Sequence, residues 1–125
     1  MKYGIAALAC CLALTACGDG SAGSKAKNTS AFKPKMNVSL QVDGHTATIT
    51  VDTDMTISPE HYGMARSKGE GHIHMYLDNG EKIGVKERVY LFENLESGRH
   101  SVKVSLHNND HTPYDVTTTK EFDIP

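Results

Sequence analysis

Residues 72–80 read HIHMYLDNG, an alternation of apolar side chains with polar or aromatic ones that ends in a turn signal. Successive side chains of a β-strand point to opposite faces, so Ile73, Met75 and Leu77 are predicted to face a core. The closing Asp-Asn-Gly favours a turn because these residues accept positive φ. The stretch therefore predicts one strand of a sheet with one apolar face.

The same alternation recurs along most of the chain. Further strands are expected at residues 38–42, 47–51, 89–92, 102–106 and 116–124. Turn signals such as Asp43-Gly44 separate them, and no segment of about ten or more residues has a helical period. About six or seven short strands predict an all-β fold, an antiparallel β-sandwich of immunoglobulin-like or cupredoxin-like type.

A local pattern at residues 95–104, LESGRHSVKV, supports this fold class. It resembles the turn that enters strand F of immunoglobulin-like sandwiches, where a leucine, a glycine turn and an aromatic residue precede alternating valines. The resemblance implies that His100 takes the place of the corner tyrosine, which hydrogen-bonds back to the backbone. We interpret His100 as a structural residue.

The N-terminus predicts export. A positive start is followed by an apolar run over residues 5–14, shorter than the roughly 20 residues that span a bilayer and typical of a signal peptide. The run ends in Leu14-Thr15-Ala16-Cys17, which resembles the lipobox of bacterial lipoproteins. The resemblance implies cleavage before Cys17 and attachment of diacylglycerol to its thiol. An ordinary secretory signal is the alternative.

This reading divides the chain into three parts. Residues 1–16 are the expected signal peptide, residues 17–35 a lipidated flexible tether rich in Gly, Ser, Ala, Lys and Asn, and residues 36–125 the β-sandwich domain. The expected location is extracytoplasmic, anchored to membrane lipid through Cys17 (in the outer membrane if the cell is Gram-negative). Cleavage leaves no second cysteine for a disulfide, and a net charge of −2 without a basic cluster does not favour nucleic acid.

The chemistry most open to prediction lies in the seven histidines. His72 and His74 share the face opposite the predicted core, and in an immunoglobulin-like topology the strand that ends at His107 runs antiparallel beside them. Imidazoles suit copper and zinc, and a thioether adds affinity for Cu(I). The candidate metal ligands are His72, His74, His107 and His111, with His61 and Met64 as additional candidates. A blue-copper site is disfavoured because the Cys17 thiol carries the lipid.

The same histidines have a structural interpretation. They could be surface residues that hydrogen-bond to carbonyls and to Asp110, in a turn built by residues 108–113. The pattern also resembles small His-bearing domains of bacterial envelope proteins, through Gly71, His72 and His74, then Gly98, His100 and Val102, then Asn109, Asp110, His111 and Pro113. That resemblance implies an extracytoplasmic module and leaves its ligand open.

No motif predicts an enzyme: there is no recognisable serine nucleophile, carboxylate pair or phosphate-binding loop. Two hypotheses remain. The first is a lipid-anchored protein that binds copper or zinc through the histidine cluster. The second is a metal-free immunoglobulin-like module that binds a protein partner or another envelope component through the same loops.

Overall fold

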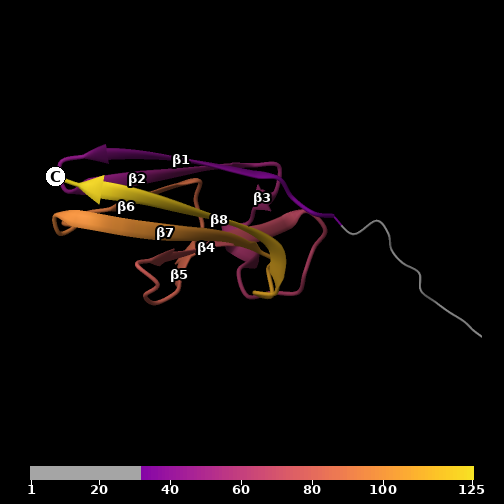
Figure 1. Cartoon of the computed structure of the whole chain (residues 1–125). Helices are drawn as coiled ribbons and strands as arrows, with labels where there is room; N and C mark the ends of the chain where they lie inside the picture. The colour runs from indigo at the N-terminus through magenta and orange to yellow at the C-terminus, as the bar shows by residue number, and fades with distance from the viewer. Residues whose placement is uncertain (1–31) are drawn as a thin grey trace, which may run out of the picture. The chain divides into compact units, whose positions relative to one another are not determined.

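The computed structural model describes residues 32–125. These residues form eight strands, nearly all antiparallel, in two sheets (Figure 1). The predicted signal peptide, the lipobox at Leu14–Cys17 and most of the tether lie outside these residues. The strands are β1 (Met36–Asp43), β2 (Thr46–Thr53), β3 (Thr56–Ile57), β4 (Glu70–Leu77), β5 (Ile83–Val85), β6 (Val89–Phe92), β7 (Gly98–His107) and β8 (Pro113–Ile124).

One sheet has the order β1-β2-β6, and the other has the order β3-β4-β7-β8 with β5 paired to β4. Apolar side chains of both sheets form a single core, as the alternation predicts. Ile49 of β2, Met75 of β4 and Val104 of β7 have no exposed surface. Full burial of one such side chain contributes about 1.5–3 kcal/mol relative to its exposed state. The predicted all-β sandwich is confirmed.

The structure also contains short elements that the alternation did not predict. In the polar segment before β4, Thr56 and Ile57 pair in parallel with Glu70 and Gly71, and Pro59–His61 form a turn of 3₁₀ helix. β5 spans three residues, and elements this short leave no periodic signal. Within residues 32–125, no helix is long and apolar enough to cross a membrane.

The antiparallel pairing of β4 with β7 positions the histidines, as the topology predicts. In its register His72 lies opposite His107 and His74 lies opposite Ser105. The two strands approach closely at Gly71, where an added Cβ would lie 1.9 Å from the carbonyl oxygen of His107. No larger residue fits there, because real Cβ contacts are far longer.

His100 occupies the corner position that the sequence predicts. Its Nε2 donates to the carbonyl oxygen of Glu96 at 2.7 Å, and its Nδ1 lies 2.7 Å from Oδ2 of Asp78. Both nitrogens are thus engaged, and the structural interpretation of His100 is confirmed. The backbone carbonyl of Glu96, and then the carboxylate of Asp78, favour the protonated ring, so the pKa of His100 is raised above its ordinary value.

Candidate metal centre

His72 and His74 lie on the face of β4 opposite the core, as the alternation predicts. That face is nevertheless buried here, since their exposed fractions are 0% and 2%. The ring of Tyr62, directly after the 3₁₀ helix, packs against His72 with a centroid separation of 4.4 Å, and the ring of His107 stacks on His74. Covering this face converts two predicted surface residues into members of a buried polar cluster.

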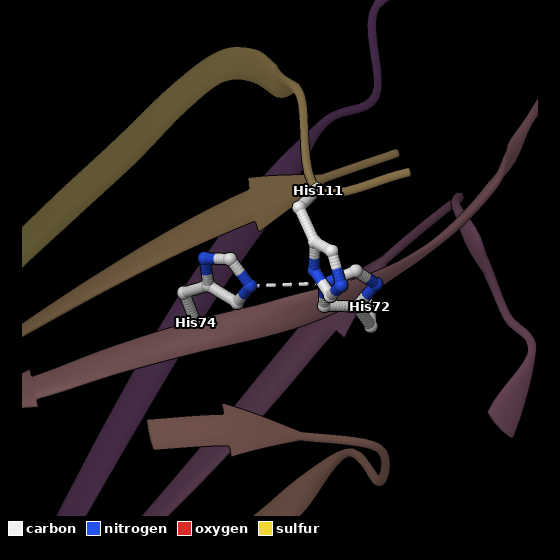
Figure 2. Close-up of side chains that lie close together, drawn as sticks. All are labelled: His72, His74 and His111. Carbon is white, nitrogen blue, oxygen red and sulfur yellow. Dashed lines mark hydrogen bonds between the residues drawn. The ribbon is translucent and has the colours of Figure 1, made fainter. Parts of the chain in front are cut away.

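His111 joins the cluster from the loop between β7 and β8. The loop is closed by backbone hydrogen bonds from Asn108 N to the Thr112 carbonyl (2.7 Å) and from His111 N to the Asn108 carbonyl (2.9 Å). His111 adopts φ 72°, in the left-handed region, which costs a non-glycine residue about 1–2 kcal/mol. The loop holds this strained conformation, and it brings the ring over β4 (Figure 2).

The three rings converge on one another, as Figure 2 shows. Nε2 of His72 lies 2.9 Å from Nε2 of His74 and 3.1 Å from Nδ1 of His111. One nitrogen from each ring falls within 4.8 Å of the other two. Nitrogens bound to one ion at about 2.0–2.1 Å lie about 2.9–3.4 Å apart for bond angles of about 90–110°. Both separations measured from Nε2 of His72 fall in this range, and the third pair of nitrogens lies within 4.8 Å, so the triad of His72, His74 and His111 could hold a metal ion after a small side-chain adjustment.

The environment keeps two of these rings neutral, the state in which imidazole binds a metal. Burial lowers the pKa of His72 to about 4, with further contributions from the positive charge of His111 and His107. Burial likewise lowers the pKa of His74 to about 3, assisted by His107 and His72. Protons therefore compete little with a metal for these nitrogens near neutral pH.

The hydrogen bonding of the triad is incomplete. Nδ1 of His72 and Nδ1 of His74 are buried without a hydrogen-bond partner among residues 32–125. Buried polar groups in this state cost stability, typically about 1–3 kcal/mol each. A cation bound at the converging Nε2 atoms would leave each Nδ1 with its proton and still without an acceptor, so the case for a metal rests on the convergence of the ring nitrogens and not on these two atoms.

His107, also predicted as a ligand, lies beside the triad with both ring nitrogens engaged. Its Nε2 lies 3.0 Å from the Ser105 hydroxyl, and its Nδ1 lies 3.0 Å from the carbonyl oxygen of His111. Its ring stacks on His74 with a centroid separation of 3.7 Å. In this arrangement His107 supports His74 and the strained loop.

The two additional candidates, His61 and Met64, are exposed and lie on either side of Tyr62 in the sequence. Nδ1 of His61 is 2.8 Å from Oε1 of Glu70, and Met64 is 55% exposed. Between them is Tyr62, which the sequence analysis did not single out. The ring of Tyr62 packs against His111 at 4.8 Å as well as against His72. A lone tyrosine in a polar segment gives no periodic signal, so only the folded contacts identify it.

Comparisons with known proteins support the fold. No family model matches the chain, and no curated protein matches its sequence. The PKD1 domain of Vibrio anguillarum Epp is similar in structure, with a TM-score of 0.51 and 15% identity over 76% of this chain and 96% of that one. The PKD1 domain of the Vibrio cholerae metalloprotease PrtV gives 0.49 and 14% identity, over 74% and 98%. The fold is that of a PKD-like β-sandwich.

In this PKD-like domain the triad lies at one end of the β4–β7 pair, beside the loop that leads into β8. The similarity to these domains concerns the fold alone, and the capacity to bind a metal depends on the histidines of this chain. His72 and His74 are supplied by a strand, whereas His111 is supplied by a loop. The site thus combines two rigid ligands with one whose position depends on loop conformation.

Proposed function

We propose that this PKD-like domain binds a transition-metal cation, copper or zinc, through His72, His74 and His111. The observation that carries the proposal is the convergence of three ring nitrogens within 4.8 Å, two of them on buried rings. Imidazole is a ligand common to copper and zinc. The cysteines of the chain are Cys10, Cys11 and Cys17, so no thiolate is available within the domain.

Nε2 of His72, Nε2 of His74 and Nδ1 of His111 would bind the ion. Three protein ligands leave at least one position open on a four-coordinate metal, unlike the closed sites of structural zinc. His107 would keep the ring of His74 in place by stacking, and Tyr62 would limit the access of water to His72. An open position suits a site that takes up and releases its metal.

We further propose that the protein acts outside the cytoplasm as a binding protein and not as an enzyme. The motif at Leu14–Cys17 supports a lipid anchor, and the two chains of a diacylglycerol give stable membrane attachment where a single chain does not. Metal handling or delivery at a bacterial membrane follows from combining that anchor with the triad.

Calorimetric titration tests the metal site. Residues 32–125, a compact unit with its own core, are titrated with Cu(II), Cu(I) and Zn(II) at neutral pH. We expect binding tighter than about micromolar for at least one of these ions, and its loss in the double variant His72→Ala/His74→Ala. His45→Ala is the matched control, because His45 is exposed and bonds to the Leu95 carbonyl outside the triad.

Binding that is weaker than about micromolar for all three ions, or that survives the double variant, would contradict the metal proposal. The metal-free interaction module, with a protein or another envelope component as partner, would then be the better hypothesis.

A further inference from the structure

No hydrogen bond or ion pair joins the triad to a carboxylate within residues 32–125, although acidic residues adjoin it in sequence. Glu70, two residues before His72, accepts a hydrogen bond from Asn109 Nδ2 (3.1 Å) and pairs with His61. Asp110, next to His111, pairs with Arg66 at 3.1 Å and accepts hydrogen bonds from Thr112. Both carboxylates therefore bind other residues, and the atoms with which the triad could bind a metal are imidazole nitrogens.

Two lysines flank the triad on the side of β5. Gly84 of β5 pairs with His74, and Lys82 and Lys86 directly precede and follow the three residues of this strand. Nζ of Lys86 lies 4.2 Å from the ring centroid of Tyr62, which in turn packs against His72. The environment of the triad is thus positive even before a metal binds.

A divalent cation bound by the triad would keep its full positive charge. Three imidazoles that are neutral when they bind the metal would leave both charges of a divalent cation uncompensated, with two ammonium groups nearby. A four-coordinate ion with three protein ligands also takes one ligand from outside. Electrostatic complementarity therefore favours a negatively charged ligand at the open position.

We propose that the metal-loaded site takes a small exogenous anion as its remaining ligand, attracted by Lys82 and Lys86. This inference rests on the proposed metal site and names what else that site binds. Tyr62 packs against two rings of the triad, at 4.4 Å from His72 and 4.8 Å from His111, which favours a small anion. A halide, bicarbonate or a small carboxylate has the matching chemistry.

Azide titration of the Cu(II)-loaded domain tests the inference. Azide bound to Cu(II) produces a charge-transfer absorption band, and electron paramagnetic resonance reports the same event at the metal. A single positive charge roughly 8 Å from an anion in a water-like medium changes the affinity for that anion about twofold. We expect the double variant Lys82→Gln/Lys86→Gln to weaken azide binding about fivefold at low ionic strength and to bind Cu(II) more tightly than wild type, because the same positive charges repel the cation.

Two further variants separate charge from structure. Lys82→Arg/Lys86→Arg keeps the charges and should keep the azide affinity, and Lys33→Gln removes a charge from an exposed lysine before β1 and should have no effect. Absence of the azide band, an unchanged affinity in the glutamine variant, or an equal loss in the arginine variant would each overturn the inference. Failure of the wild-type domain to bind any of Cu(II), Cu(I) and Zn(II) would overturn the proposed function, whereas Cu(II) binding without an azide response would overturn this inference alone, so the two failures are distinguishable.

Discussion

Acidification should destabilise the metal-free domain, because two buried imidazoles resist protonation. Burial lowers the pKa of His72 to about 4 and that of His74 to about 3, against about 6.5 in an unfolded chain. Below about pH 6.5 the unfolded state therefore takes up protons on these rings that the folded state does not. Their effect on stability is absent above that pH and becomes increasingly unfavourable as the pH falls toward the folded pKa values.

The expected loss in the free energy of unfolding follows from the pH interval between about 6.5 and the pH of the measurement. Each pH unit below about 6.5 costs about 1.4 kcal/mol per ring, so at about pH 5 each histidine costs about 2 kcal/mol. Both rings have almost no exposed surface, yet local water and coupling between them reduce the sum. We expect a combined loss of about 2–4 kcal/mol. Because pH 5 lies above both folded pKa values, the loss does not depend on how far below 5 they fall.

Other histidines titrate over the same range. The pKa of His107 is lowered, chiefly by burial, so this ring acts in the same direction as the pair. The pKa of His61 is raised by its hydrogen bond to Glu70, and that of His100 is raised by Glu96 and Asp78. A raised pKa contributes stability below about 6.5 that is lost as the pH rises through the folded pKa. A comparison of variants is therefore required.

Urea unfolding at about pH 7.5 and about pH 5 provides the assay, with a chelator present and tyrosine fluorescence as the probe, since the chain has no tryptophan. Wild type should lose about 2–4 kcal/mol more than the variant His72→Gln/His74→Gln over this interval. The control His45→Gln should behave as wild type. Equal losses in wild type and the double variant, within about 0.5 kcal/mol, would refute the argument that burial suppresses protonation of the pair.

Three further predictions concern the loop, the strand contact and the anchor. His111→Gly should lower metal affinity at least about tenfold in calorimetry, while the free energy of unfolding changes by less than about 1 kcal/mol, because glycine relieves the left-handed strain at this position. Gly71→Ala should cost more than about 2 kcal/mol in urea unfolding, because its Cβ would overlap the His107 carbonyl; an unchanged midpoint would contradict the close approach. Cys17→Ser should move the expressed protein from the detergent phase to the aqueous phase in phase partitioning, whereas continued membrane association would argue against lipidation.

Much of the fold could be predicted from local patterns. The longer strands follow from side-chain alternation, as at residues 102–106, and the corner role of His100 follows from a short turn pattern. β3 and β5 could not be predicted, because two or three residues carry no periodicity and pair only when β4 is already in place.

The sequence by itself determined that His72 and His74 share one face of a strand, since alternation is a property of the backbone. It also contains the motif at Leu14–Cys17, and lipidation there remains a prediction. Only the tertiary structure decided that this face is buried and that His111 joins it across 39 residues of chain, at 3.1 Å from His72. Convergence within hydrogen-bond distance depends on the β4–β7 register and on a strained loop. The register and the loop conformation both result from packing between segments far apart in the sequence, so a local sequence pattern does not predict them.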